Sequence, residues 1–200
     1  MTGLDERPLR QALERLAKEK QVAFALLLCE RLVPAFEEFS REVDFDDSLY
    51  RTGLDSVWHY LRQGGKSSNY ARMAEQCRDH APDTEEFSHP LTSAALNAAL
   101  SIAATIRLLA DDDADHVVEA AGLARDTAAL YAQAAGVTPP RSLSFDDIMK
   151  HPIVQRELRQ QAEDLKFVET LPADEPQGLI SLVKDRAAEA PELLPPRSGR

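Results

Sequence analysis

The chain has 200 residues, and its 23 lysines and arginines against 34 aspartates and glutamates give a formal net charge of −11. This acidic balance, without a dense basic run, argues against a nucleic-acid-binding protein and against attraction to anionic membranes. A chain of this length can bury a core as one domain, and its two cysteines, Cys29 and Cys77, lack metal-ligand spacing and are predicted to be reduced core thiols.

The N-terminal stretch MTGLDERPLR has no cationic region followed by an apolar run, so we expect no signal peptide and a cytoplasmic protein. A short amphipathic helix is predicted from Pro8 to about Lys18, because proline suits the first helical position. A second helix is predicted from Gln21 to about Arg41. Pro34 lies inside it and cannot donate a backbone hydrogen bond, which predicts a kink near residues 30–34.

A third helix is predicted from Asp47 to Gln63, ended by two glycines. Gly53 in its interior lowers helix propensity, which indicates that a neighbouring element approaches closely at that point. Ser67 can cap a fourth helix that ends near His80. The first half of the chain is therefore predicted to consist of helices joined by short loops.

The segment from Ser88 to Leu109 is apolar on nearly its whole circumference, with Pro90 at its start, and is predicted to be the buried central helix. It is too alanine-rich and too interrupted by small polar residues for a convincing bilayer span. These polar residues recur every fourth position. They either allow another helix to pack closely or line a small-ligand cleft in which Asn97 is the main hydrogen-bonding group. They are Ser93, Asn97, Ser101 and Thr105.

An acidic cluster follows the central helix. Its carboxylates and one imidazole could share a hard cation, but aspartates between two helices are typical of a capped turn, so we predict no metal and no cofactor. The cluster contains Asp111, Asp112, Asp113, Asp115, His116 and Glu119.

Four further helices are predicted after this turn. The first ends near Ala135, and a short one starts with a capping box between Ser144 and Asp147. A long helix begins at Pro152, directly after His151, and ends near Leu171. The last is capped by Asp174 and Gln177 and ends near Glu189.

No segment alternates between apolar and polar residues for long enough to predict a strand. We therefore expect an all-α, single-domain antiparallel bundle of about eight helices around the buried central helix, spanning residues 1–190. Residues 191–200, PELLPPRSGR, are expected to form a flexible proline-rich tail.

Motifs that would identify a reaction are missing. The five histidines form no HExxH pattern, and there is no GxSxG, Walker or GxGxxG sequence. The sequence therefore leaves open whether the protein is an enzyme.

The strongest candidate for a site is the hairpin of the second and third predicted helices. Charged residues beside the kink face charged and aromatic residues on the partner helix, and antiparallel packing would pair Glu30 with Arg51 and Arg31 with Asp55. These pairs either fix the register of the hairpin or bind a small polar ligand against an aromatic wall. The candidate ligand-binding residues are Glu30, Arg31, Tyr50, Arg51, Asp55 and Trp58.

The same region, Leu26 to Leu61, resembles the YjaG-like bacterial family of uncharacterised proteins, known as domain of unknown function 416. Lys150 to Leu158, KHPIVQREL, is similar to a later family segment. The resemblance implies an all-helical cytoplasmic protein and implies no activity. It is carried by Cys29, Glu30, Arg31, Pro34, Phe39, Phe45, Tyr50, Arg51, Leu54, Asp55 and Trp58.

Without catalytic motifs, we expect a protein that acts by protein–protein interaction or regulation, through a protein partner or through self-association as a homodimer. The alternative is a small-ligand-binding protein or an enzyme that uses the cluster of Glu30, Arg31, Arg51 and Asp55. A third hypothesis is an acidic inhibitor of a basic partner such as a nuclease.

Overall fold

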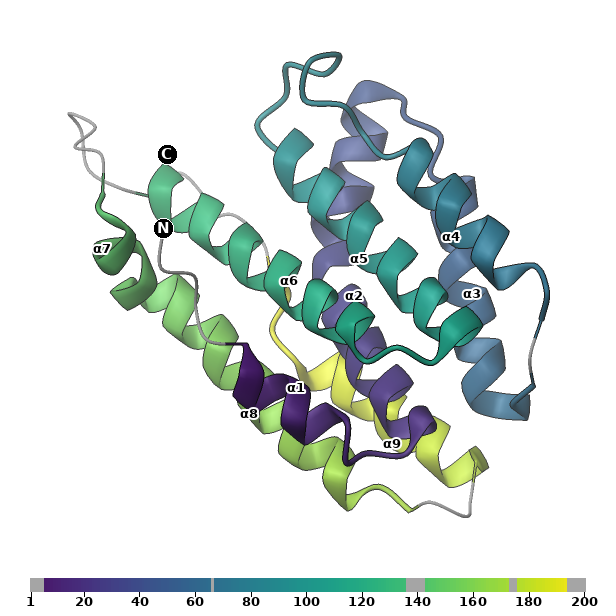
Figure 1. The fold of residues 1–200 in the computed structure, drawn as a ribbon. Coiled ribbons are helices and arrows are strands. Elements are labelled where there is room, and N and C mark those ends of the chain that lie inside the picture. The colour runs from purple at the N-terminus through teal and green to yellow at the C-terminus, as the bar shows by residue number, and fades with distance from the viewer. Residues whose placement is uncertain (1–5, 66, 136–142, 173–175, 194–200) are drawn as a thin grey trace.

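The computed structural model describes residues 6–65, 67–135, 143–172 and 176–193 (Figure 1). Within these ranges every regular element is an α-helix, and the predicted all-α fold is confirmed. The helices are α1 (Arg7–Leu13), α2 (Lys18–Val43), α3 (Ser48–Gln63), α4 (Tyr70–Asp79), α5 (Thr92–Asp111), α6 (Asp115–Ala134), α7 (Phe145–Lys150), α8 (Pro152–Thr170) and α9 (Pro176–Glu189).

Helix α5 is the buried centre of the bundle, as predicted, and packs against α2, α3, α4 and α6 (Figure 1). It is long and apolar enough to cross a membrane by length and composition, but most of it is buried inside the protein's own core. It begins at Thr92, later than predicted, because the residues before it form a turn in which the His89 ring accepts the Leu91 N–H at 3.3 Å.

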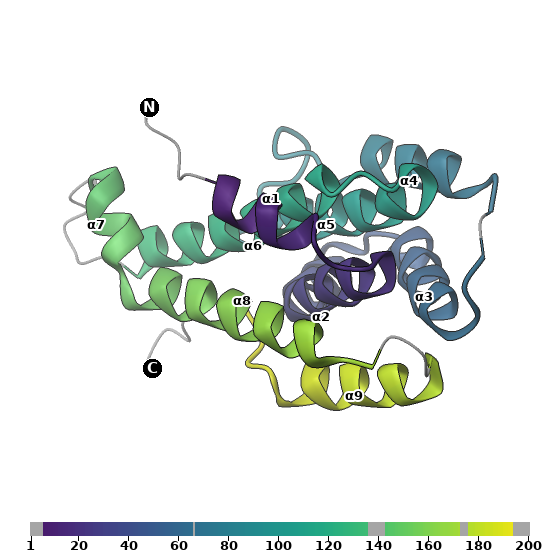
Figure 2. The same cartoon turned by 60° about the horizontal axis from the view of Figure 1, so that its bottom comes forward.

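Helix α2 is the second organising element. Figure 2 shows it between α8 and α9 on one side and α4 and α5 on the other, which explains its apolar circumference. The helix continues through Pro34 to Val43. The backbone N–H of Leu193, which lies beyond α9, donates to the carbonyl of Arg31 at 3.0 Å.

The end of the described chain is thereby held against α2. Leu193 is 2% exposed and belongs to the core, although the sequence places it in the predicted tail. The chain is therefore packed past residue 190, and residues 194–200 of the predicted tail lie outside the described residues.

Close helix packing also explains Gly53. A Cβ atom at this position would lie 2.7 Å from Cδ1 of Ile106 and 3.4 Å from Cγ2 of Ile102, both on α5. The predicted close approach is confirmed, since a side chain at this position would require the terminal methyl group of Ile106 on α5 to shift.

The polar seam of α5 is used for packing. Asn97 donates to Oγ1 of Thr127 on α6 at 3.0 Å, and the buried hydroxyl groups of Ser101 and Thr105 contact the thiol of Cys29 on α2 at 3.5 and 3.3 Å. The seam therefore joins α5 to its neighbours, which favours the packing alternative over a ligand cleft around Asn97.

Helix starts in the second half of the chain follow the predicted caps. Ser144 and Asp147 form a reciprocal capping box on α7, and the His151 ring accepts the N–H of Ile153 at the start of α8. Asp174, the predicted cap of α9, lies outside the described residues.

Candidate ligand-binding cleft

Three of the six predicted site residues, Glu30, Arg31 and Trp58, line a cleft between α2, α3 and α9. The indole Nε1 of Trp58 donates to Oε1 of Glu30 at 2.8 Å, and both side chains line a cavity of about 510 Å³. Glu30 comes from α2, close to Pro34, and Trp58 comes from α3. The cleft therefore lies beside the proline of α2, next to the charged residues of the predicted site.

The lining of this cleft combines apolar and charged side chains. The short and aliphatic residues come from α2, from α9 and from the residue that follows α9, namely Val33, Pro34, Ala187, Ala188 and Ala190. The charged lining groups besides Glu30 and Arg31 are Glu37, Lys184 and Glu192. The ammonium of Lys184 lies 5.5 Å from the centre of the Trp58 ring, close enough for a cation–π contact.

Burial raises the pKa of the Glu30 carboxyl above its ordinary value. The hydrogen bond from Trp58 opposes this shift, the negative charge of Glu37 adds to it, and the positive charge of Lys184 opposes it. Burial is the largest of these causes, so the ionised Glu30 carboxylate is less well solvated in the cleft than in water. A positive group brought into the cleft would stabilise that charge.

Arg31 also lines the cleft, but its guanidinium group is turned into the protein and is only 2% exposed. Its Nε and Nη2 donate to the two carboxylate oxygens of Glu157, at 3.3 and 2.9 Å. Its Nη1 donates to Oδ2 of Asp164 at 2.5 Å and to the carbonyl of Leu27 at 3.2 Å. All three nitrogens are therefore engaged within the protein.

The carboxylates that face Arg31 are equally well satisfied. Oδ1 of Asp164 accepts from Gln160 at 2.9 Å and from Nε of Arg186 at 2.8 Å, and Oε1 of Glu157 also accepts from Gln161 at 2.9 Å. Two positive and two negative charges thus form one network that joins α2, α8 and α9. This network is a structural support behind the cleft.

The predicted pairing across the hairpin is wrong. Arg51 is 59% exposed and pairs with Asp47 at 2.6 Å and Glu37 at 3.2 Å instead of Glu30. Arg31 pairs with two acidic residues of α8 instead of Asp55. The physical reason is that the inner face of α2 at Arg31 turns toward α8, so the nearest carboxylates come from a distant part of the sequence.

The remaining predicted residues lie elsewhere. The hydroxyl of Tyr50 is in the core and donates to the carbonyl of Cys77 at 3.0 Å. Asp55 lines a separate cavity of about 580 Å³ together with His59 and Ser67. Arg51 touches the cleft only through Glu37, which lines it. The six residues therefore do not form one site.

Several residues of the cleft and its support come from the last two helices, where no site was predicted. Lys184 lines the cleft from α9, and the acidic partners of Arg31 lie on α8. The sequence does contain a signal for the acidic partners of Arg31. The buried positions of α8 recur at spacings of three and four residues, as on a core-facing helix, but the three positions in the middle of this series are polar. These positions are Val154, Glu157, Gln161, Asp164 and Val168.

The acidic turn after α5 is held by hydrogen bonds between side chains. Oδ2 of Asp111 accepts from Arg107 at 2.9 Å and lies 3.1 Å from Nε2 of His116. Among the residues that the structure describes, no group of three or more acidic, histidine or cysteine side chains is arranged to hold a metal ion.

Comparison with known proteins places this geometry in a family. Residues 8–190 match the model of a family described as "Protein of unknown function (DUF416)". The chain is 24% identical over 190 residues to a protein of Salmonella typhimurium named "Uncharacterized protein YjaG", covering 94% of this chain and 93% of that protein. A Salmonella typhi protein of the same name matches equally. The crystal structure of a DUF416 family protein from Shewanella baltica has a TM-score of 0.75 at 21% identity, covering 94% of this chain and 95% of that one.

Proposed function

This chain belongs to the DUF416 family of proteins of unknown function, and we propose that it acts by non-covalent binding in the cytoplasm, with the cleft between α2, α3 and α9 receiving an organic cation. The observation that supports this most strongly is the Glu30 carboxylate, which is largely buried in the cleft beside Trp58. The role we assign is that of a regulator or adaptor, because the sequence contains none of the motifs that would identify a reaction.

The charge of the cleft favours a cation. Glu30, Glu37 and Glu192 contribute three carboxylates, of which Glu37 is paired with Arg51, whereas the charge of Arg31 is compensated by Glu157 and Asp164. Lys184 forms no ion pair with the residues that the structure describes, and its exposed side chain can move aside. A ligand cation would then gain the attraction of a poorly solvated carboxylate.

The shape and chemistry of the walls favour a ligand with a flat or apolar body. The indole ring of Trp58 can stack on a planar cation, and Val33 and Pro34 offer aliphatic contact. An anionic ligand has less support, because the donors of Arg31 are already used within the protein.

The cation can belong to a small molecule or to a lysine or arginine side chain of a partner protein. The second source keeps the expected protein–protein interaction as part of the proposal. Self-association as a homodimer is likewise a proposal. Native mass spectrometry of the protein purified from its cytoplasm separates these cases, since a retained small molecule, a protein partner and a second copy differ greatly in mass.

A direct test uses the intrinsic fluorescence of Trp58, which is the chain's single tryptophan and therefore reports on this cleft alone. The probes are benzamidine, a planar cation, and benzamide, its neutral analogue. We expect benzamidine to change the Trp58 emission in a saturable manner and benzamide to have no saturable effect. Glu30→Gln keeps an acceptor for the indole and removes the charge, and should weaken benzamidine binding about tenfold.

The matched control is Glu86→Gln, which removes one exposed carboxylate outside the cleft and should leave binding unchanged. Equal responses to benzamidine and benzamide, or equal binding by wild type and Glu30→Gln, would contradict recognition of a cation by Glu30.

A further inference from the structure

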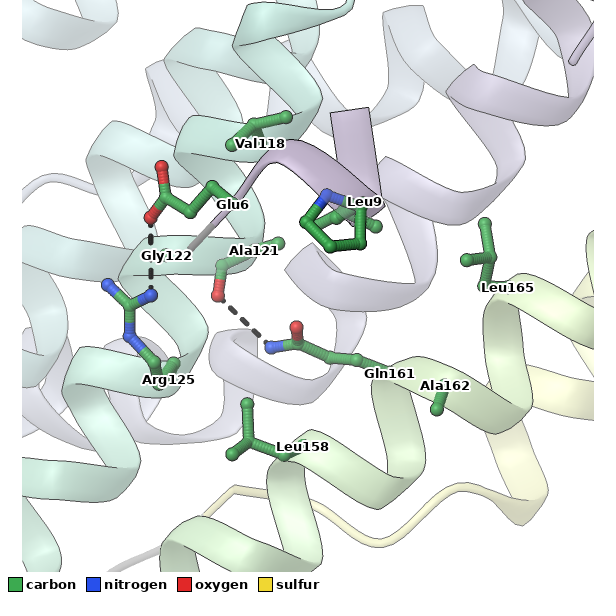
Figure 3. Close-up of a pocket in the computed structure, with 11 residues that line it drawn as sticks. Glu6, Leu9, Val118, Ala121, Gly122, Arg125, Leu158, Gln161, Ala162 and Leu165 are labelled. Atoms are coloured by element: carbon green, nitrogen blue, oxygen red, sulfur yellow. Dashed lines mark hydrogen bonds and ion pairs between the residues drawn. The ribbon is translucent and has the colours of Figure 1, made fainter. Parts of the chain in front are cut away.

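A second cavity lies between α1, α6 and α8, apart from the cleft described above (Figure 3). Its volume is about 290 Å³, and aliphatic side chains dominate its walls, among them Leu9, Val118, Leu158 and Leu165. The space exists because short residues, Ala121 and Gly122 on α6 and Ala162 on α8, occupy the positions where larger side chains would fill it. A cavity of about 150 Å³ with such walls holds a benzene ring, so this one accommodates a bicyclic molecule.

One polar group points into this apolar space. Gln161 is 9% exposed, and its amide nitrogen donates to the carbonyl of Ala121 at 3.0 Å and to Oε1 of Glu157 at 2.9 Å. Both partners are acceptors, so the nitrogen must face them and the amide oxygen must face the other way. Figure 3 shows this oxygen on the pocket side of the amide. It receives no hydrogen bond from the residues that the structure describes.

Gln161 is also held rigidly. Glu157, to which it donates, is fixed by the two-point pair with Arg31, so the amide cannot rotate without losing buried hydrogen bonds. The cavity therefore presents a preformed hydrogen-bond acceptor. A ligand that donates to it binds without the entropy loss of ordering the Gln161 side chain.

The rim of the cavity carries no net charge. The charged lining residues are Glu6 and Arg125, and Nη1 of Arg125 lies 3.2 Å from Oε1 of Glu6, as the dashed line in Figure 3 marks. These opposite charges compensate each other, so neither a carboxylate nor an ammonium ligand gains from entering. A neutral ligand fits best.

We propose that this cavity is a second small-molecule site, which binds neutral, apolar molecules of bicyclic size that carry one hydrogen-bond donor, and that Gln161 recognises the donor through its amide oxygen. No residue lines both this cavity and the proposed cation cleft, so binding at each can be measured separately, although Arg31 of the cleft supports Glu157 behind Gln161.

The test compares indole, which has one N–H donor, with benzofuran, which has nearly the same shape and none. Binding is followed by titration of the isotope-labelled full chain in NMR spectra, with the side-chain amide of Gln161 and the methyl groups of Leu9 and Leu158 as reporters. We expect saturable shifts at these reporters with indole and binding at least about fivefold weaker for benzofuran, which would cover the Gln161 amide oxygen without donating a hydrogen bond to it.

Gly122→Leu should abolish binding of both probes by filling the cavity. It should fold normally, because a Cβ atom at Gly122 meets its nearest neighbours, Arg125 and Glu6, at 3.5 and 3.8 Å. Ala134→Leu, at an exposed position of the same helix, is the control that should keep binding. Gln161→Met should remove the preference for indole.

Equal affinity for indole and benzofuran in the wild type would overturn the role of Gln161. Unchanged binding by Gly122→Leu, or shifts confined to residues outside α1, α6 and α8, would overturn the site itself. Because Trp58 fluorescence reports on the other cleft, each proposal can fail without the other.

Discussion

Arg31 and Glu157 form a two-point ion pair in the interior, with Nη2 2.9 Å from Oε1 and Nε 3.3 Å from Oε2, although 126 positions separate them in the sequence. Their side chains are 2% and 3% exposed. Asp164 contacts the same guanidinium, so one arginine of α2 is joined to two acidic residues of α8. The pair therefore fixes how these two helices pack behind the candidate cleft.

Removing this arginine should destabilise the fold strongly. Arg31→Met would leave Glu157 and Asp164 buried without their main counter-charge, and we expect a loss of about 3–5 kcal/mol in the free energy of unfolding, measured by urea denaturation. The control is Arg51→Ala, whose ion pairs are exposed and should contribute less than about 1 kcal/mol. Similar losses for the two variants would show that the buried network is not structural.

Gly53→Ala should destabilise the protein although alanine is the better helix former. The new Cβ atom would lie 2.7 Å from Cδ1 of Ile106, and overpacking of this kind costs about 1–3 kcal/mol, more than the gain of up to about 1 kcal/mol in helix propensity. Ile106→Val removes the clashing methyl group. Thermal unfolding of the four variants of this double-mutant cycle should show that the second substitution relieves the first, and additive losses would contradict the predicted clash.

Glu30→Gln should change the dependence of stability on pH. Burial raises the pKa of Glu30 in the folded protein above the ordinary 4.5, so the folded state binds the proton more tightly than the unfolded state does. The contribution of Glu30 to stability is thus present below pH 4.5 and is lost as the pH rises through the folded pKa. Glu30→Gln should therefore be more stable than wild type at pH 7, and this gain should shrink toward pH 4.

Urea denaturation at pH 4, 5 and 7 measures this difference, with Glu86→Gln as the control for general loss of negative charge. A variant that is less stable than wild type at pH 7 would mean that the charged hydrogen bond from Trp58 outweighs the burial of the carboxylate.

Leu193→Ala should lower stability as a core substitution does. Leu193 is 2% exposed and follows α9, so its truncation leaves a cavity against α2 and should cost about 2–5 kcal/mol. Leu182→Ala is the matched control, because this leucine on α9 is 42% exposed and its loss should cost less than about 1 kcal/mol. Differential scanning calorimetry of both variants provides the comparison. Equal melting temperatures would place Leu193 outside the core.

Local features of the chain predicted most of the helices. The capping box of Ser144 and Asp147 and the sequence of His151 before Pro152 satisfy backbone groups within one turn, so neighbouring residues suffice to place these helix starts. The apolar circumference of α5 likewise indicated burial, and Gly53 indicated a close neighbour. Such signals act over a few residues and need no knowledge of topology.

The candidate site was predicted only in part, because its chemistry depends on which helix faces which. A charged Arg31 in an apolar helix needs a carboxylate partner inside the protein. The sequence alone does not show which of the 34 aspartates and glutamates this partner is. The packing of α8 against α2 selects Glu157 and Asp164, and it leaves Arg51 and Asp55 at the surface. Glu30 and Trp58 meet because α3 also contacts α2 at this level, whereas Lys184 enters from α9. Such long-range choices follow from how whole helix faces fit together, and no local pattern encodes them.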